Sequence, residues 1–333
     1  MTAIHSYGFG LATENASREI IEVFYSHYGL TPDSELAAQL LAVTGLTDKE
    51  NGYTRLNNDQ QQAFKAELGA LAGSEKTVVL CVLTHDAAPD SVPAAFLKLQ
   101  LLSARLVRPH EVNLNGMFGV LHNLAWTNEG PIDLSELAER QLAARLQGRQ
   151  LSVFSVDKFP RMSDYVVPKG IRVADTSRVR LGAYLGEGTT VMHEGFVNFN
   201  AGTDGPAMIE GRISAGVMIG ANSDLGGGCS TMGTLSGGGK QVIAVGENCL
   251  IGANAGIGIP LADGCVIEAG LYVTAGTKIQ LLDAQGEHRS SCKAMDLIGQ
   301  PGLLFRRNSL SGAVECLPLQ SEVELNEELH AHN

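Results

Sequence analysis

Aromatic residues and positive charge are both scarce in this chain of 333 residues. Aromatic side chains make up 5% of it, and 24 Lys and Arg face 36 Asp and Glu, for a formal net charge of −12. Nucleic acids and anionic membrane surfaces are bound through basic patches, so this balance argues against both as partners. Any anionic ligand must be held by local basic groups.

Cysteine motifs and long apolar runs are missing as well. The six cysteines form no C-x-x-C pair and have no metal-ligand spacing, so we expect them to be small buried residues. No apolar run approaches the roughly 18 residues that a membrane-spanning helix needs. We therefore expect a cytoplasmic protein.

Residues 1–150 read as an α/β domain that lacks a Gly-rich phosphate loop. Residues 77–84 form an apolar, β-branched run and are expected to be a buried strand. We find no catalytic motif in this half and expect a role in assembly or in covering the substrate, followed by a linker at 151–170. Helix-spaced apolar residues predict helices in five segments, 14–29, 32–44, 57–72, 91–106 and 133–148.

Glycine is abundant, with 39 residues, and from about residue 171 the chain changes to a period of six. Many glycines and few rings suit repeated tight corners around a narrow interior. Three six-residue sides close a triangular coil of about 18 residues, so this pattern predicts a left-handed parallel β-helix over 171–280 and a short β extension over 281–333. The aliphatic registers are Val173, Val179, Leu185, Val191 and Val197; Ile213, Ile219 and Leu225; Val245, Ile251 and Ile257; and Leu261, Ile267, Val273 and Ile279.

The register breaks between Val197 and Ile213 and again around 231–244. We interpret both breaks as inserted loops, because loops on a rigid scaffold commonly carry function. The segment 233–242 is expected to be a mobile lid. His193 is the only histidine in the repeat region, which excludes a three-histidine zinc site and leaves His193 either as a general base or in a structural role.

Several longer strings identify the family more narrowly. They are FVNFNAGT (196–203), MIEGR (208–212), NSDLGGG (222–228), MGTLSGGG (232–239), GANAGIG (252–258), EAGLYVTAG (268–276) and LFRRNS (304–309). In this order they closely resemble the tetrahydrodipicolinate N-succinyltransferase family of hexapeptide-repeat acyltransferases, in its actinobacterial and pseudomonad form. The resemblance is dense over 165–333, whereas residues 1–150 match in size and character only. It implies a homotrimer that acts on succinyl-CoA, as co-substrate, and tetrahydrodipicolinate, with no required cofactor.

The resemblance also implies roles for individual residues. Glu210 corresponds to the family's catalytic carboxylate, described either as an acyl-anhydride nucleophile or as a general base. We add Gly233 to the catalytic set, because backbone N–H groups exposed at glycines can bind an oxyanion. The positions that correspond to substrate or CoA contacts are Arg212, Gly227, Ser230, Ala253, Glu268, Ala269, Gly276, Lys293, Arg306, Arg307, Asn308 and Ser309.

A magnesium ion on the trimer axis is implied through Glu194. The second metal ligand of the family is an Asp, and its position in ADTSRVR (174–180) is Ser177 here. Three copies of Glu194 alone make a thin oxygen cage for magnesium. We therefore expect weak or absent metal binding, with Asp175 as an alternative ligand.

Two other functions remain open at this point. Another hexapeptide-repeat enzyme, transferring an acyl group to a different amine or hydroxyl, would differ only in its pockets. A non-catalytic β-helix scaffold would have smooth coils without Gly-rich insertions, unlike this chain.

Overall fold

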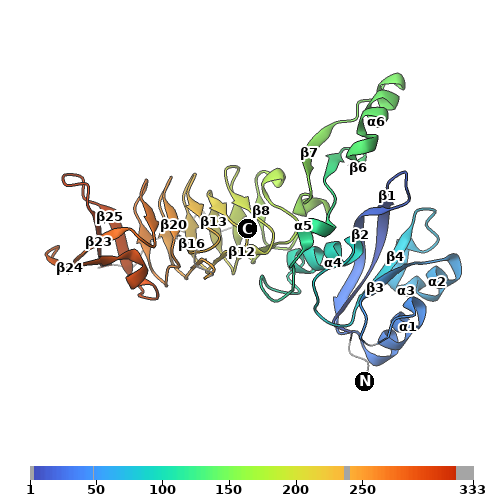
Figure 1. Ribbon diagram of the computed structural model, residues 1–333, viewed down its shortest axis with the longest axis horizontal. Coiled ribbons are helices and arrows are strands. Elements are labelled where there is room, and N and C mark those ends of the chain that lie inside the picture. Colours follow the sequence, from blue (N-terminus) through green and yellow to red (C-terminus); the bar gives the residue numbers. More distant parts are fainter. Residues whose placement is uncertain (1–3, 48, 236–240, 320–333) are drawn as a thin grey trace. The chain divides into compact units, whose positions relative to one another are not determined.

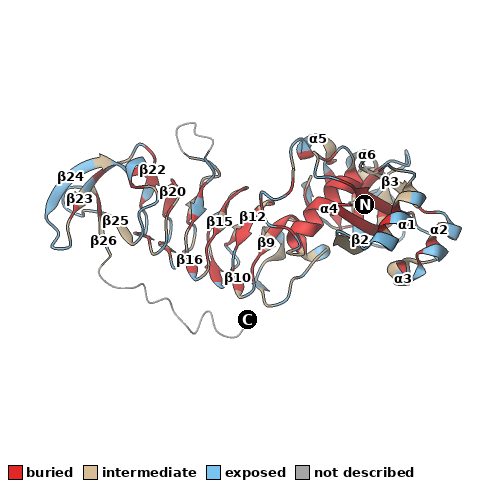
Figure 2. Ribbon diagram, turned by 90° about the horizontal axis from the view of Figure 1, so that it is seen from below, coloured by how far each residue is buried: buried red, intermediate tan, exposed pale blue. Residues whose placement is uncertain are grey.

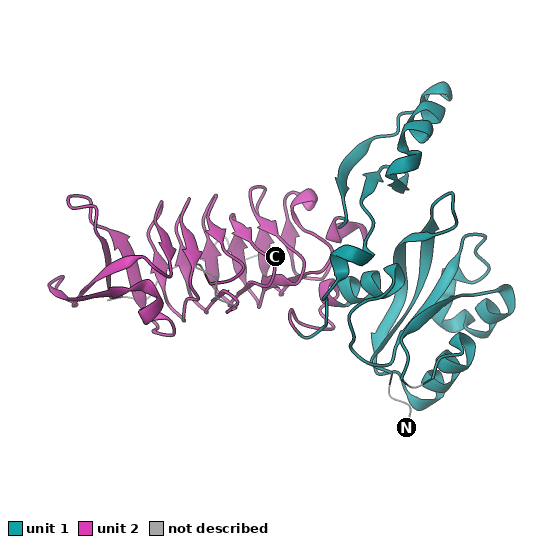
Figure 3. Cartoon of the chain, viewed as in Figure 1, with its two compact units in different colours: residues 1–101, 111–160 teal, residues 102–110, 161–333 magenta. Residues whose placement is uncertain are grey.

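The computed structural model describes residues 4–47, 49–235 and 241–319 and forms two compact units (Figure 3). Unit 1 comprises residues 1–101 and 111–160, and unit 2 comprises residues 102–110 and 161–333. The domain boundaries expected from the sequence stay predictions. The expected linker, 151–170, contains the strand β7 (Val153–Asp157) and the short helix η2 (Met162–Asp164).

Unit 1 is built on an antiparallel sheet with the strand order β2-β1-β4-β3 (Figure 1). The expected strand at 77–84 is confirmed as β4, and all six of its residues are buried. Gly8 and Gly10 of β1 leave room for the ring of Tyr25, which lies where a Cβ on either glycine would be. The strands are β1 (Ser6–Glu14), β2 (Ile20–Leu30), β3 (Gly52–Arg55) and β4 (Val78–Leu83).

The helix predicted for 14–29 is wrong, because this segment forms the end of β1, the turn and most of β2. Ile20, Ile21, Val23 and Tyr25 are buried there. β-branched and aromatic residues suit a pleated, half-buried surface, and in a short segment this preference outweighs an approximate helical spacing.

Three of the other predicted helices are confirmed, as α1 (Ser34–Thr44), α4 (Val92–Ser103) and α6 (Leu134–Leu146). The side chain of Asp33 caps α1 by accepting hydrogen bonds from the N–H groups of Glu35 and Leu36. The segment 57–72 is broken twice, at Phe64, whose φ of −104° and ψ of 29° end the first helix, and at Gly69, whose φ of 52° ends the second. It forms α2 (Asn58–Ala63), α3 (Lys65–Leu68) and η1 (Gly69–Leu71).

A smaller three-stranded sheet in unit 1 has the order β6-β5-β7 and carries α6. Its strands are β5 (Leu124–Thr127), β6 (Gly130–Asp133) and β7; α5 (Met117–Val120) precedes them. Its buried residues are Ile132, Ala144 and Leu151. Leu137 of α6 packs on this small core, whereas Leu142 is 59% exposed and Leu146 80%.

Unit 2 is a parallel β-helix whose coils present three walls, which we call A, B and C. Wall A contains β8 (Arg172–Val173), β10 (Thr189–Val191), β13 (Ala207–Ile209), β16 (Ser223–Leu225), β19 (Leu250–Ile251) and β21 (Val266–Ile267). Wall B contains β11 (Phe196–Val197), β14 (Arg212–Ile213), β17 (Ser230–Thr231), β20 (Gly256–Gly258) and β22 (Tyr272–Thr274). Wall C contains β9 (Ala183–Leu185), β12 (Ala201–Thr203), β15 (Met218–Ile219) and β18 (Ala244–Val245). The short helix η3 (Thr176–Arg178) precedes β9.

The predicted inward residues stack in register. Val191 pairs with Ile209, Leu225 with Ile251, and Ile251 with Ile267, all in parallel. Figure 2 shows the buried residues following the strands of the β-helix, and the aliphatic residues of these registers belong to one core cluster or pack against it. A single repeating step thus accounts for the interior of this unit.

The first break in register is not an inserted loop, contrary to the prediction. Thr203 pairs with Leu185 and Ile219, and Ile209 pairs with Val191 and Leu225, so the period of six continues as far as residue 209. The repeat was missed because the inward residue Thr203 is not aliphatic. Its hydroxyl is tolerated in the interior because it forms a 2.7 Å hydrogen bond with Thr189. The phase changes after residue 209, where the turn before β14 is only Glu210 and Gly211.

The second break is an insertion, as predicted. Its base is an antiparallel pair between Thr234 and Val242, with a 2.8 Å bond from the Leu235 N–H to the Gln241 carbonyl. The remainder of the expected lid, 236–240, lies outside the described residues.

The C-terminal extension is a β structure, as expected. β25 stacks in parallel on β21, while β23 and β24 form an antiparallel hairpin. The elements are β23 (Lys278–Leu282), β24 (His288–Lys293), η4 (Ala294–Leu297), β25 (Leu303–Arg307) and β26 (Val314–Pro318). None of the helices in the described segments has the length and apolarity needed to cross a membrane.

Candidate active site along one edge of the β-helix

The turns that join wall A to wall B form a continuous edge, here called the A–B edge. In successive coils these turns follow β10, β13, β16, β19 and β21, and each coil stacks on the next. Sites predicted from separate motifs therefore lie along one line. They are Glu194, Glu210, Gly227, Ala253, Glu268 and Ala269.

Two carboxylates converge on Gly227 at this edge. A Cβ placed on Gly227 would lie 3.5 Å from Oε2 of Glu194 and 3.5 Å from Oε2 of Glu210. The two oxygens are therefore no farther apart than twice that distance. Any side chain at residue 227 would occupy the space between them, so glycine keeps this space open for a ligand.

Glu210 is fixed by the short turn on which it sits. Its N–H donates to the carbonyl of Leu225 at 2.8 Å, and its own carbonyl accepts from the N–H of Gly228 at 3.2 Å. Gly211 follows without room for a side chain, because a Cβ there would overlap the sulfur of Cys229. The turn therefore holds Glu210 against the next coil.

Wall B carries the next group of predicted residues. Arg212 and Ser230 are in register, and Nη2 of Arg212 donates to the Ser230 hydroxyl at 2.6 Å. The Arg212 side chain is exposed. Because guanidinium groups bind carboxylates and phosphates in two-pronged fashion, this face can hold an anionic ligand next to the carboxylates of the edge.

Sequence reasoning missed further side chains on the same wall. Arg178 and Arg180 both lie over the ring of Phe196, at 6.0 and 5.8 Å. Arg178 also donates to the carbonyl of Glu194 at 2.7 Å. The sequence contained a signal for this shared surface, because residues that directly precede an inward residue of wall B lie on the same outer face. They are Arg178, Phe196, Arg212, Ser230, Gly256 and Tyr272.

Gly233 lies after wall B rather than before it, so it is not in the A–B edge with Glu210. Its carbonyl accepts from the N–H of Ile243 at 3.2 Å, at the base of the inserted loop. Within the described segments neither its N–H nor that of Gly227 donates a hydrogen bond. Gly227, rather than Gly233, lies beside Glu210, so its N–H is the better placed of the two to act near that carboxylate.

The C-terminal residues have partners within unit 2. Oε2 of Glu268 accepts from the N–H of Arg307 at 2.7 Å, which ties the edge to β25. Nε of Arg306 and Nδ2 of Asn308 donate to the carboxylate of the buried Glu315, at 2.9 and 2.7 Å.

These hydrogen bonds keep the pKa of the Glu315 carboxyl below its ordinary value. The hydrogen bond from Asn308 and the charge of Arg306 lower the pKa of this carboxyl, although desolvation opposes them. Arg306 and Asn308 therefore hold β25 and β26 together, whatever ligand they also contact. Four other predicted contacts are exposed outside the A–B edge: Gly276, Lys293, Arg307 and Ser309.

No cysteine in the described chain is poised as a nucleophile. Burial, with a smaller contribution from the charge of Glu210, raises the pKa of Cys229 to about 12. The pKa values of the other five thiols are raised by burial as well. Transfer through a cysteine thioester is therefore disfavoured. His193 is exposed, with Nε2 4.0 Å from Oε1 of Glu194.

The residues present in one chain supply a single exposed carboxylate for the implied magnesium ion. Within the described residues no group of three His, Cys, Asp or Glu side chains could hold a metal. Asp175 is engaged elsewhere, since its Oδ1 accepts from both the N–H and the hydroxyl of Ser177. A ligand set on a threefold axis would come from three chains.

Fold and site together define a hexapeptide-repeat acyltransferase with a left-handed β-helix. A model of the hexapeptide repeat of succinyl-transferase matches residues 242–275. The models for the N-terminal and middle parts of tetrahydrodipicolinate N-succinyltransferase match residues 53–119 and 121–161.

Full-length relatives narrow the class. Proteins of Pseudomonas paraeruginosa and Pseudomonas aeruginosa are each 59% identical over 344 residues, covering 99% of both chains. A Vibrio cholerae protein is 56% identical over 342 residues, covering 99% of this chain and 100% of its own. All three are named 2,3,4,5-tetrahydropyridine-2,6-dicarboxylate N-succinyltransferase.

A solved structure agrees over both units. It is a Campylobacter jejuni chain assigned as a 2,3,4,5-tetrahydropyridine-2-carboxylate N-succinyltransferase, with a TM-score of 0.88 and 32% identity, covering 96% of this chain and 94% of its own. This chain belongs to the tetrahydrodipicolinate N-succinyltransferase family, which confirms the resemblance found in the motifs and sets aside the non-catalytic scaffold.

Proposed function

We propose that this chain transfers the succinyl group of succinyl-CoA to the amine of tetrahydrodipicolinate, in its open form 2-amino-6-oxopimelate, in the succinylase branch of lysine and diaminopimelate biosynthesis. The names of relatives that align over 99% of the chain support it. The structural observation that carries it is the convergence of the Glu194 and Glu210 carboxylates on Gly227.

The two carboxylates suit an amine acceptor. An amine arrives mainly as ammonium near pH 7, and negative charge at the A–B edge attracts it. It must lose a proton before it attacks, and Glu210 is the group that accepts this proton or holds the amine in place. In the alternative route Glu210 itself attacks the thioester and forms an anhydride.

The bonds balance without a cofactor. The amine nitrogen attacks the thioester carbonyl, a C–N bond forms, and the C–S bond breaks as the tetrahedral intermediate collapses. The proton released by the amine passes to Glu210, and the departing thiolate of CoA takes up a proton. The N–H of Gly227, which donates no hydrogen bond within the described residues, is the first candidate donor for the developing oxyanion, and Gly233 is the second.

Anionic groups of both substrates require cationic partners. Arg212 on wall B is the candidate for a carboxylate of the succinyl group or acceptor, with Ser230 holding its guanidinium. The exposed Lys293 and Arg307, with Ser309, are the candidates for the phosphates of CoA. Ala253, Ala269 and Gly276 expose small surfaces along which pantetheine can lie.

We place this enzyme in a homotrimer with each site between neighbouring β-helices. The flat walls of a β-helix suit threefold packing, and a ligand on one wall would then be covered by the adjacent subunit. Sedimentation at micromolar concentration should give a trimer, and a fully active monomer would overturn this arrangement. Magnesium, if it binds, would be held by Glu194 from three subunits; we expect activity to survive chelation, and its complete loss, restored by magnesium, would contradict us.

The activity is tested by release of free thiol from acyl-CoA. With tetrahydrodipicolinate as acceptor, succinyl-CoA should be used in strong preference to acetyl-CoA, and neither should release thiol without acceptor. Preference for another acyl group or another amine would instead identify a different hexapeptide-repeat acyltransferase. Mass analysis of the product distinguishes transfer to the amine from hydrolysis.

A further inference from the structure

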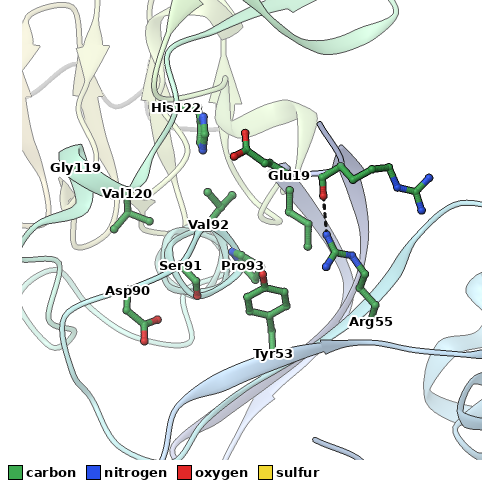
Figure 4. A pocket seen from close by; sticks show the side chains of 12 residues that line it. Glu19, Tyr53, Arg55, Asp90, Ser91, Val92, Pro93, Gly119, Val120 and His122 are labelled. Carbon is green, nitrogen blue, oxygen red and sulfur yellow. Dashed lines mark hydrogen bonds between the residues drawn. The ribbon is translucent and has the colours of Figure 1, made fainter. Parts of the chain in front are cut away.

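Unit 1 contains a cavity of about 560 Å³ beside the start of α4 (Figure 4). β3, the turn before β2, the end of α5 and His122 after it also line the cavity. None of its lining residues belongs to the A–B edge or to wall B. The proposed succinyl transfer gives this cavity no role.

One wall of the cavity carries Arg55 and Tyr53. Tyr53 and Arg55 are two residues apart on β3, so their side chains leave the same face of the strand. Arg55 and Arg18 share one carboxylate, since Nε of each lies near Glu14, at 2.9 and 3.4 Å. Nη2 of Arg55 also donates to the carbonyl of Arg18 at 2.9 Å, so within the described residues Nη1 is the part of this guanidinium that remains for a ligand.

Other walls of the cavity carry negative charge. Glu19 and Asp90 line it, and Figure 4 shows the Glu19 carboxylate beside His122 and Asp90 beside Ser91. Within the described segments Asp90, His122 and the Tyr53 hydroxyl make no hydrogen bond. These groups are therefore available to a ligand without loss of an existing bond.

The start of α4 adds a donor and an apolar floor. The Ser91 hydroxyl is buried, and it has no hydrogen-bond partner among the described residues. A serine at this position usually caps the helix through an N–H two or three residues on, but Pro93 removes the first of these. Val92, Pro93 and Val120 supply apolar surface between the charged walls.

We propose that this cavity binds a small aliphatic amino acid. Its carboxylate contacts Arg55 and the Tyr53 hydroxyl, and its ammonium group contacts Asp90. The aliphatic side chain packs on Val92, Pro93 and Val120. A ligand with only one of the two charges leaves the opposite wall unpaired, and this is the source of selectivity.

Calorimetry on the full-length protein with three related probes tests the proposal. L-Norleucine carries both charges; hexanoate is the same molecule without the ammonium group, and pentylamine the same molecule without the carboxylate. We expect norleucine to bind with a Kd on the order of 1 mM, as suits an open site. Hexanoate and pentylamine should each bind about tenfold more weakly or worse.

Two cavity variants and two matched controls complete the test. Asp90→Asn and Tyr53→Phe should each weaken norleucine about tenfold, since the first removes the negative charge that pairs with the ammonium group and the second removes a hydrogen bond to the carboxylate. Asp59→Asn on α2 and Tyr28→Phe on β2 should leave its affinity unchanged. Circular dichroism checks that all four fold as the parent does.

The outcomes separate cleanly, and none depends on succinyl transfer. Norleucine binding that is selective over both fragments and lost in the cavity variants supports the amino-acid site. Equal affinity for norleucine and either fragment overturns it, because a site for one charge alone is then sufficient. Absence of binding at millimolar concentration, or binding that the cavity variants do not change, also overturns it.

Discussion

Unit 2 repeats one structural step along its axis, whereas unit 1 uses each of its elements once. In the β-helix an inward residue such as Ile251 has the same environment as Leu225 before it and Ile267 after it. In unit 1 the strands β1 and β2 and the helix α6 each pack against something different. In unit 2 the same inward position recurs many times, so one atypical residue does not change the predicted structure. In unit 1 each element is predicted from its own residues alone, and one misjudged period is enough to assign a strand as a helix.

The proposed catalytic residues all lie in unit 2, so the largest expected effect on turnover comes from a substitution there. Glu210→Gln should lower turnover by at least about 10²-fold, the low end for a general base, because glutamine keeps the size of the side chain and loses its basicity. Binding of succinyl-CoA should change little. Stopped thiol-release assays measure the first quantity and calorimetry the second.

Two carboxylates serve as controls for Glu210. Glu247, exposed on the turn after wall C, and Glu35, exposed on α1, should tolerate glutamine with turnover unchanged. Wild-type turnover in an intact Glu210→Gln oligomer would refute the catalytic role and direct attention to His193. A succinylated Glu210 found by mass spectrometry would favour the anhydride route over the general base.

Core truncation sharpens the comparison of the two units. Ile251→Ala in the fully buried stack should lower the free energy of unfolding by about 2–5 kcal/mol, through lost burial and a residual cavity. Leu146→Ala, at a residue 80% exposed in unit 1, should change it by less than about 0.5 kcal/mol. Urea unfolding followed by circular dichroism gives both values. A large cost at Leu146 would mean that the side chain is covered in solution.

The single tryptophan adds a reporter for unit 1. Trp126 lies in β5 and is buried, so its fluorescence follows unit 1 alone. We expect Ile251→Ala to shift the circular dichroism transition more than the fluorescence transition. Equal shifts would show that the two units unfold together.

The inward threonine offers a smaller effect. Thr203→Val keeps the volume but removes the hydroxyl that bonds Thr189 at 2.7 Å and accepts from the Gly186 N–H at 3.1 Å. We expect a loss of about 1–2 kcal/mol in unfolding free energy, because buried polar partners are left unpaired. Thr54→Val on β3, with no such bonds, should be near neutral. A neutral Thr203→Val would mean that volume alone decides that position.

A pH-dependent effect is expected at Glu315. Its pKa is lowered below the ordinary 4.5 in the folded chain, mainly by Asn308, so its contribution to stability is present above that value and is lost as the pH falls through the folded pKa. Glu315→Gln should be less stable than the parent at about pH 7, and the difference should shrink below about pH 4.5. Urea midpoints across this range test the sign, and a difference that grows in acid would contradict it.

The sequence supported a residue-level prediction where repetition constrained it. Ile213, Ile219 and Leu225 were assigned inward from spacing alone, and their pairings bear this out. The same procedure misread the break before Ile213, because Thr203 is not aliphatic and because a turn shortened to Glu210-Gly211 changes the phase just as an insertion does. The segment 14–29 failed for a different reason, since in so short a stretch sheet pairing with β1 outweighs helical spacing.

The sequence by itself determined the coil, because local steric demands at corners and inward positions recur with a fixed period, and its longer motifs determined the family. It did not determine that Glu194 and Glu210 meet over Gly227, that Arg178 and Arg180 flank Phe196 on the wall of Arg212, or that Arg306 is committed to Glu315. Those contacts depend on how successive coils and the C-terminal strands stack. Stacking joins residues far apart in the chain through distances that no local pattern records, and only the tertiary structure decided them.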